Sequence, residues 1–217
     1  MNVGRPLSLS EHYWTFLYGL RAAALYLIGR MNGVRHLHER WATVRLPDSV
    51  QSVLFVCTGN ICRSPLACAY FQSLIKKEGR SMTVRSAGLE TIPGMPVDAK
   101  AKAVVLEHRL SLDEHVTTQI HKELLDRSDL VLVMEMTQKN RVMKLYPQHR
   151  HKVLLLGQFC GRGLQEINDP YQGTKEDFQA CFERIQESCD CVMQQLGGQS
   201  VSHHSQVKSV EVKEPDE

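Results

Sequence analysis

Short apolar segments that alternate with helical segments constrain the fold of this chain most strongly. Between residues 51 and 196, runs rich in Val, Leu and Phe recur, and segments with helical spacing of apolar residues separate them. Strands joined through helices form parallel sheets whose right-handed crossovers place helices on both faces. The sequence therefore predicts an α/β domain built on a four-stranded parallel sheet. The expected strands are 52–56, 82–85, 130–134 and 152–156, and the expected helices are 65–77, 98–110, 119–126, 137–146 and 176–195.

The first 50 residues form a separate helical extension in this interpretation. Ser8-Leu9-Ser10-Glu11 fits a capping box, and apolar residues then recur at helical spacing from Tyr13 to Met31. The apolar face of this helix is expected to pack on the main domain or on a second copy of the chain. Alternatively, it attaches the protein to a membrane surface. A further alternative is an autoinhibitory element that covers a cleft of the main domain.

The remaining sequence places limits on the class of protein. Residues 197–217 are polar and are predicted to be a disordered tail. A net charge of +2 without a basic stripe argues against a nucleic-acid partner. Seven cysteines at irregular spacing do not indicate a disulfide framework, and no signal peptide is recognised, so we expect a cytoplasmic protein. The stretch 13–29 is shorter than a typical spanning helix and contains Arg21.

The chemistry is concentrated in the loop 57–64, which follows the first predicted strand and precedes a helix. Backbone N–H groups at a helix N-terminus attract an anion. Gly59 permits a tight turn, and Asn60 tolerates a left-handed conformation. Cys57 is the expected nucleophile, since a helix N-terminus and a nearby arginine favour the thiolate. The Ser64 hydroxyl could donate a hydrogen bond to the sulfur.

Two further residues complete a phosphate-transfer site. Arg63 offers a planar fork for two phosphate oxygens. Asp169, in Asp169-Pro170-Tyr171, is expected to protonate the leaving oxygen and later to activate water. This chemistry needs no metal or other cofactor, and the sequence shows no convincing metal-binding cluster.

With these motifs, residues 51–196 resemble a low-molecular-weight protein tyrosine phosphatase. The resemblance rests on the loop Val56-Cys57-Thr58-Gly59-Asn60-Ile61-Cys62-Arg63-Ser64-Pro65, on Ser86-Ala87-Gly88, on His115-Val116 and on Asp169-Pro170-Tyr171. It implies hydrolysis of protein phosphotyrosine through a phosphocysteine, with Cys57, Arg63 and Asp169 as the catalytic residues. It also implies a hydrogen-bond network that holds the loop, made by Asn60, Ser64, Ser86 and His115. The residues expected to bind the substrate are Thr58, Gly59, Asn60, Ile61, Cys62, Ser64 and Tyr171.

The sequence departs from the family pattern around the substrate cleft. The segment 89–96 lacks the aromatic residue that family members often carry there, and Gln172 stands where a second tyrosine is common. Tyr171 is therefore the expected aromatic wall, in a more open cleft. Ile61 favours an aryl ester, because arginine-phosphate phosphatases tend to have threonine at this place.

Several alternatives stay open. Cys62 is either a small filler or, as in relatives, a disulfide partner of the nucleophile under oxidation. Cys68, Cys160 and Cys181 are expected to be core residues, and Cys189 and Cys191 cannot face each other on one helix. Glu135 either orients the loop or caps a helix. An arginine-phosphate phosphatase, an arsenate reductase and a non-catalytic phosphate-binding scaffold are the alternative functions. Arsenate reductases that share this loop need a further cysteine pair in a segment after the second strand. Residues 87–159 contain no cysteine, which argues against this function. The expected partner is a phosphotyrosine protein, and a tyrosine kinase acting in the opposite direction is a further candidate.

Overall fold

The computed structural model describes residues 46–47, 49–160 and 165–204. All of these belong to one compact unit, Val44–Glu217. The predicted N-terminal helix and the end of the predicted tail, residues 205–217, lie outside the described residues. Leu46 and Val50, which the sequence assigns to the extension, are buried in the core of the described unit.

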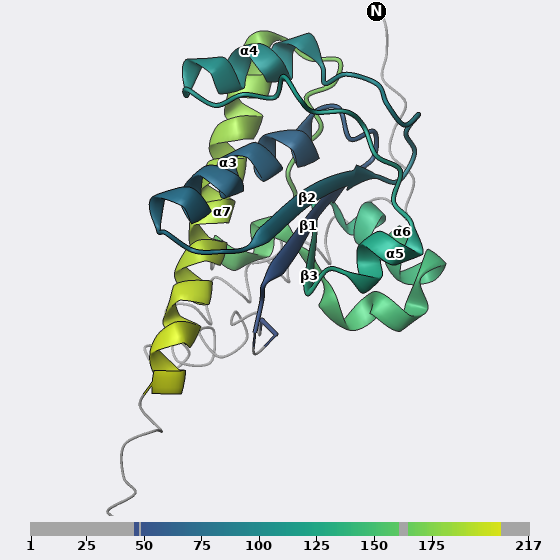
Figure 1. The fold of residues 1–217 in the computed structure, drawn as a ribbon. Helices are drawn as coiled ribbons and strands as arrows, with labels where there is room; N and C mark the ends of the chain where they lie inside the picture. The colour runs from purple at the N-terminus through teal and green to yellow at the C-terminus, as the bar shows by residue number, and fades with distance from the viewer. Residues whose placement is uncertain (1–45, 48, 161–164, 205–217) are drawn as a thin grey trace, which may run out of the picture. The chain divides into compact units, whose positions relative to one another are not determined.

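A four-stranded parallel sheet forms the centre of this unit (Figure 1). The strands lie in the order β2-β1-β3-β4, so the first strand occupies an inner position between the second and the third. The predicted fold class is thereby confirmed. The strands are β1 (Ser52–Cys57), β2 (Thr83–Gly88), β3 (Leu130–Val133) and β4 (Val153–Leu155).

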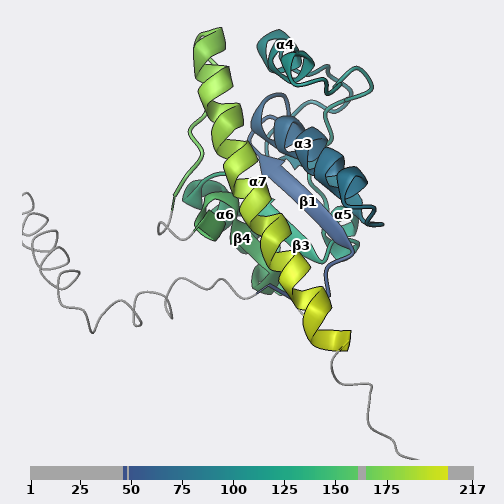
Figure 2. The ribbon, with the colours of Figure 1, turned by 90° about the vertical axis from the view of Figure 1, so that its left-hand side faces the viewer.

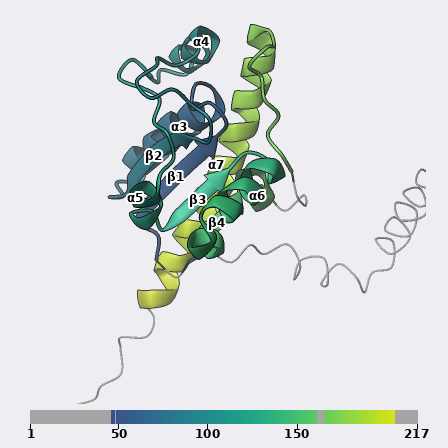
Figure 3. The ribbon, with the colours of Figure 1, turned by 90° about the vertical axis from the view of Figure 1, so that its right-hand side faces the viewer.

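Helices cover both faces of the sheet. Figure 2 shows α3 and α7 on one face, and Figure 3 shows α5 and α6 on the other. The described helices are α3 (Arg63–Lys77), α4 (Ala99–Glu107), α5 (Lys122–Asp126), α6 (Met136–Leu145) and α7 (Lys175–His204), with 3₁₀ turns η1 (Pro147–Lys152) and η2 (Leu156–Cys160).

The alternation of side chains along β1 divides the core into two layers. Val53 and Phe55 point into the layer shared with α3 and α7, where Phe55 packs edge-on against Phe71 with ring centroids 5.5 Å apart. Leu54 and Val56 point into the opposite layer beneath α5 and α6. Since β1 is buried on both faces, it is a continuous apolar run, as expected for an inner strand of a parallel sheet. This leaves the carboxyl end of β1 rigidly placed.

Three helices and one strand differ from the sequence-based prediction. The helix predicted over 98–110 ends as α4 at Glu107, and the strand predicted over 82–85 continues as β2 to Gly88. The helix predicted over 119–126 begins only at Lys122, because the preceding residues extend the edge of the sheet. Ile120 N donates to Gly88 O and Gly88 N donates to Thr118 O, both at 2.8 Å. The last helix, predicted to end at residue 195, continues as α7 to His204 and so includes the first residues of the predicted tail. Extending a formed helix by single residues is favourable once its nucleus exists.

Candidate active site

The loop between β1 and α3 surrounds the sulfur of Cys57. Cys57 is the last residue of β1 and Arg63 is the first residue of α3. The backbone N–H of Asn60 donates to Cys57 Sγ at 3.3 Å, and Ser64 Oγ lies 3.0 Å from the same sulfur. Hydrogen bonds to a sulfur stabilise its charged form. The chain therefore turns back over Cys57 and directs polar groups at it.

Asn60 is the centre of the hydrogen bonds that hold this loop. Its φ of 56° is left-handed, a conformation that asparagine tolerates better than most residues. Its side-chain amide donates to Ser64 Oγ and to Ser86 Oγ, each at 2.9 Å, and its Oδ1 accepts from Thr118 N at 2.8 Å. His115 Nε2 lies 2.9 Å from Asn60 O, and since a carbonyl only accepts, Nε2 carries the hydrogen. The structure thus brings together the four residues expected to support the loop.

The environment of His115 affects its protonation. Burial lowers the pKa of His115 below the ordinary histidine value, and the hydrogen bond to the Asn60 carbonyl offsets this only in part. The neutral ring with hydrogen on Nε2 is therefore the favoured form at neutral pH.

The end of β2 approaches the loop so closely that only glycine fits at position 88. A Cβ on Gly88 would lie 2.9 Å from Thr58 O, 3.0 Å from Thr91 Cβ and 3.1 Å from Asn60 Cβ. Real Cβ atoms essentially never come within 3.0 Å of such neighbours. The Ser86-Ala87-Gly88 element therefore contributes a hydrogen-bond acceptor and a gap into which the loop packs.

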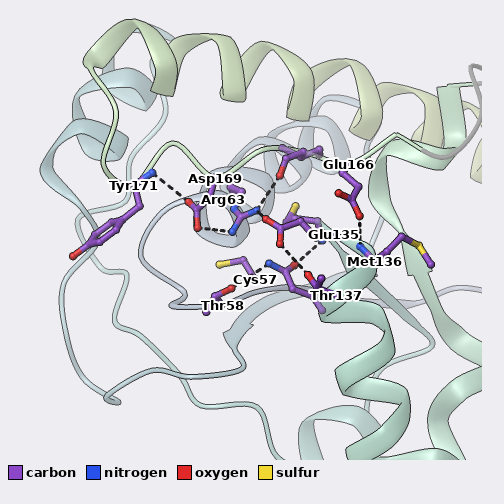
Figure 4. A network of polar contacts seen from close by, with 12 residues as sticks. Cys57, Thr58, Arg63, Glu135, Met136, Thr137, Glu166, Asp169 and Tyr171 are labelled. Carbon is purple, nitrogen blue, oxygen red and sulfur yellow. Dashed lines mark hydrogen bonds and ion pairs between the residues drawn. The ribbon is translucent and has the colours of Figure 1, made fainter. Parts of the chain in front are cut away.

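Arg63 is buried behind the loop and makes three contacts (Figure 4). Its Nη1 donates to a carboxylate oxygen of Glu135 and to Ile167 O at 2.9 Å, while Nη2 lies 2.6 Å from Asp169 Oδ2. Burial opposes the charged form, but the hydrogen bond to Glu135 and the charges of Asp169 and Cys57 outweigh it and raise the pKa of Arg63. The guanidinium is therefore charged and fixed in direction.

One donor of this guanidinium is left over. Arg63 Nε is buried, and within the described part of the chain it has no hydrogen-bond partner. A buried donor without a partner costs about 1–3 kcal/mol. An anion beside the loop could satisfy Nε and use the guanidinium charge at once.

Glu135 contacts Arg63 rather than capping a helix. It stands immediately before α6, but its side chain makes no capping hydrogen bond. One of its carboxylate oxygens accepts from Arg63 and the other from Thr137 Oγ1 at 3.1 Å. Of the two interpretations of Glu135 from the sequence, the structure supports the one in which it orients the loop.

No pattern in the sequence indicates a role for Gln138. Its Nε2 donates to Thr58 Oγ1 at 3.3 Å, and its Oε1 accepts from Met134 N at 3.0 Å. Gln138 thereby joins the loop to the end of β3. A glutamine on a helix has no local pattern that marks such a role, so only the fold reveals it.

A cavity of about 160 Å³ opens in front of the sulfur. Asp169 lies at its rim, where its Oδ1 accepts from Tyr171 N at 3.3 Å, and the Tyr171 ring is about half exposed (Figure 4). The structure thus brings the expected nucleophile, arginine and acid to one cavity. Its lining residues are Cys57, Thr58, Gly59, Ile61, Cys62, Arg63, Asp169 and Tyr171.

The second cysteine of the loop, Cys62, is buried at the start of α3. Burial first, and then the neighbouring Asp98, Cys57 and Asp169, raise its pKa, which Arg63 only partly opposes. Cys62 is therefore a protonated thiol. Both Cys57 and Cys62 are free cysteines in this structure.

Neither a metal site nor a membrane span is found among the residues described. No three His, Cys, Asp or Glu side chains there are grouped as metal ligands. No helix in the same part of the chain is sufficiently long and apolar to cross a bilayer.

Comparison with known proteins gives the family. The family model described as low molecular weight phosphotyrosine protein phosphatase matches residues 52–202. The low molecular weight protein-tyrosine-phosphatase Wzb of Escherichia coli (strain K12) is 36% identical over 150 residues, which cover 69% of this chain and 98% of that protein. The solved tyrosine phosphatase Wzb from Escherichia coli K30, in complex with sulphate, has a TM-score of 0.64 at 30% identity, over 69% of this chain and all of that chain.

A further solved relative is an arginine phosphatase. YwlE, as a cysteine-to-serine mutant with a phosphorylated active-site serine, has a TM-score of 0.65 at 30% identity and covers 67% of this chain and 95% of its own. The sheet and the loop after β1 thus define a phosphatase domain. This chain belongs to the low molecular weight phosphotyrosine protein phosphatase family.

Proposed function

We propose that this protein hydrolyses phosphotyrosine in proteins through a phosphocysteine on Cys57. The observation that carries the proposal is the single cavity shared by Cys57, Arg63, Asp169 and Tyr171. The names of the Wzb relatives support tyrosine as the substrate residue. The phosphorylated serine in the YwlE mutant supports a covalent step at the nucleophile.

In the first step, the Cys57 thiolate attacks phosphorus and the bond from phosphorus to the tyrosine oxygen breaks. Arg63 holds the equatorial oxygens, and its unpartnered Nε is available to one of them. The phosphate competes with Asp169 for the guanidinium, which frees the acid to give a proton to the leaving phenolate.

In the second step, water attacks the phosphocysteine and Asp169 accepts its proton. The bond between phosphorus and sulfur breaks, and inorganic phosphate leaves. Asn60 N–H and Ser64 Oγ stabilise the departing Cys57 thiolate. The chain itself supplies each group that these two steps require. Ser86 and His115 act by holding Asn60 in place.

The cavity favours phosphotyrosine over phosphoarginine. Ile61 and Tyr171 give the cavity apolar walls. Neither side chain can form an ion pair with the guanidinium of a phosphoarginine, as a carboxylate can. Among the described lining residues, Asp169 is the one carboxylate, and the proposed mechanism already uses it as the acid for the leaving group. A phenyl ring needs no such partner. The segment 89–96 has the exposed side chains of Ile92 and Met95 instead of an aromatic wall, which leaves the cleft open to peptides.

The remaining assignments extend this proposal. Residues 51–196 are the catalytic domain, and residues 1–50 and 197–217 are accessory. Proteins phosphorylated by a tyrosine kinase supply the substrate. The activity belongs to the cytoplasm, where thiols stay reduced. Residues 1–50 are proposed to contact a membrane surface or to mediate self-association.

The test is metal-free hydrolysis, with chelator present, of peptides that carry phosphotyrosine, phosphoserine or phosphoarginine. The wild type should cleave phosphotyrosine preferentially. Cys57→Ser should be inactive, and Asp169→Ala should be slowed mainly on poor leaving groups. Cys68→Ser, which changes a thiol outside the cavity, is the matched control. Preferential cleavage of phosphoarginine would overturn the substrate assignment, and full activity of Cys57→Ser would overturn the mechanism.

Deletion of residues 1–45 separates the roles of the extension. A rise in activity identifies an inhibitory lid, while loss of binding to anionic vesicles identifies a membrane contact. A change in the sedimenting mass identifies self-association. A chain that is unchanged in all three measurements contradicts each of these roles.

A further inference from the structure

Two cysteines outside the active site, Cys160 and Cys191, lie on elements that pack against each other. Seven cysteines are present in the chain, and all of them are free thiols in this structure. From the sequence, Cys160 is expected to be a core residue, and Cys191 is expected to have no partner on its own helix. Cys160 closes η2, and Cys191 lies in α7, so the fold decides whether they meet.

Two hydrogen bonds fix the position of η2 along α7. Cys160 Sγ lies 3.3 Å from Glu187 O, and Gln195 Nε2 donates to Phe159 O at 3.4 Å. Residues 187, 191 and 195 are four apart and share one face of the helix, each about 6 Å from the next. The face of α7 that carries Cys191 therefore lies against residues 159–160.

The direction of the Cys191 side chain turns it toward the contact of Cys160. A helical side chain leans toward the N-terminus, over the preceding turn. Cys191 therefore leans toward Glu187, whose carbonyl is the contact of Cys160 Sγ. The side chains of both cysteines are thus directed at the same carbonyl.

The pair is accessible to small molecules. Cys160 and Cys191 are both half-buried, whereas Cys189, two residues earlier on α7, is fully buried. Burial, the contact with Cys160 and the nearby Asp190 raise the pKa of Cys191 to about 12. Cys191 is therefore a thiol rather than a thiolate at neutral pH, so its own attack on a peroxide is slow.

We propose that Cys160 and Cys191 are a redox modification site, where a peroxide forms a reversible disulfide that fastens η2 to α7. This site lies apart from the loop of Cys57 and does not depend on the proposed function. Disulfides in reducing compartments are usually transient and redox-sensing, which fits a pair that is reduced at rest.

The oxidation balances with a peroxide as the oxidant. One thiolate attacks a peroxide oxygen, the O–O bond breaks, and water or an alcohol leaves, which gives a sulfenic acid. The second thiol loses its proton and attacks the sulfenic sulfur. The S–S bond forms, the S–O bond breaks, and water leaves. Two thiols have then lost two electrons and the peroxide has gained them. An external dithiol reverses the reaction by exchange.

The experiment uses the full chain with Cys57→Ser, so that oxidation of the candidate nucleophile cannot contribute. The protein is treated with hydrogen peroxide, its remaining thiols are alkylated, and it is digested without reduction. Cleavage before aspartate is essential, because Asp190 lies between Cys189 and Cys191 and this cut separates them. Mass spectrometry should find one linked peptide pair that contains Cys160 and Cys191, and dithiothreitol should remove it.

Thermal unfolding provides a second measurement. The bridge constrains the chain between residues 160 and 191, so the Tm of the oxidised protein should rise by about 5–10 °C. In Cys191→Ser both the linked pair and the shift in Tm should be lost, and in Cys68→Ser both should remain.

Either of two results would overturn the inference. The first is that Cys160 and Cys191 remain alkylatable, or become sulfinic acids, without a linked pair. The second is that the disulfides found join cysteines other than Cys160 and Cys191, and that they persist in Cys191→Ser. Because every arm carries Cys57→Ser, a failure here is distinguishable from failure of the phosphatase proposal.

Discussion

Arg63 Nη2 lies 2.6 Å from Asp169 Oδ2, so the arginine and the acid of the site are paired with each other in this structure. The arginine side chain is buried, while that of Asp169 is 43% exposed. We expect a phosphate that enters the cavity to compete with Asp169, the more exposed partner, for the guanidinium. Binding of the anion and release of the acid are therefore linked.

Replacing the acid with its amide tests this linkage. Asp169→Asn should lower kcat on phosphotyrosine peptides by about 10²–10⁴-fold, since general acid catalysis is lost. Inorganic phosphate should at the same time inhibit more tightly, because it no longer competes with a carboxylate for Arg63. Inhibition constants measured by competition provide the comparison. Weaker inhibition in the variant would show that Asp169 assists anion binding instead.

Glu135 is expected to be a positioning residue that acts through Arg63. Glu135→Gln keeps the shape of the side chain but removes its charge, so we expect kcat to fall about 10-fold while KM stays within about 3-fold. Steady-state kinetics separate the two constants. Glu166→Gln is the matched control, because Glu166 accepts from Met136 N at 2.7 Å, whereas the carboxylates paired with Arg63 among the described residues are Glu135 and Asp169. An equal loss of kcat in both variants would contradict the role of Glu135.

Gly88→Ala should both destabilise the fold and slow catalysis. The added methyl group would meet Thr58 O at 2.9 Å, and a backbone atom cannot move aside alone. We expect a loss of about 1–3 kcal/mol in the free energy of unfolding, measured with urea. Gly197→Ala in α7 is the control, since among the described residues nothing beyond its chain neighbours and the backbone of its own helix lies within 4 Å of a Cβ built there, and it should be neutral or stabilising. Unchanged stability of Gly88→Ala would mean that the loop can shift without cost.

The stability should fall as the pH is lowered below about 6.5, the ordinary pKa of histidine. Burial, above all, lowers the pKa values of His115 and His149 in the folded protein. Between the folded and unfolded pKa values the unfolded chain binds more protons, so the free energy of unfolding decreases as the pH falls through this range. Below the folded pKa values these two groups contribute no further slope.

His115→Gln should make this decrease shallower, because an amide can still donate to Asn60 O but does not titrate. His151→Gln, at an exposed position, should keep the wild-type slope. Urea unfolding at several pH values gives the slopes. If His115→Gln and the wild type have the same slope, His115 does not contribute to the pH dependence.

The sequence predicted the sheet well, because its strands are continuous apolar runs with helices between them. It predicted the ends of helices less well. The local sequence around Gln119 favours a helix, but in the fold Gln119 forms a β-bridge with Gly88. A contact between residues that are distant in the sequence leaves no local pattern. The same reason explains the site. Cys57 and Arg63 share one loop, which a motif can reveal, whereas Glu135 reaches Arg63 across 72 positions of the chain.

The register of β1 and β2, in which Cys57 stands opposite Gly88, has a consequence for experiments on folding. A slip by one residue would turn every side chain of β1 to the other face, and the sulfur of Cys57 with them. A misregistered sheet would keep its strands and much of its spectroscopic signal, yet it could not present the sulfur beneath the loop. The catalytic activity recovered during refolding would therefore measure the fraction of molecules whose strands are paired in the correct register. The assay can be run at protein concentrations too low for aggregation to compete with refolding.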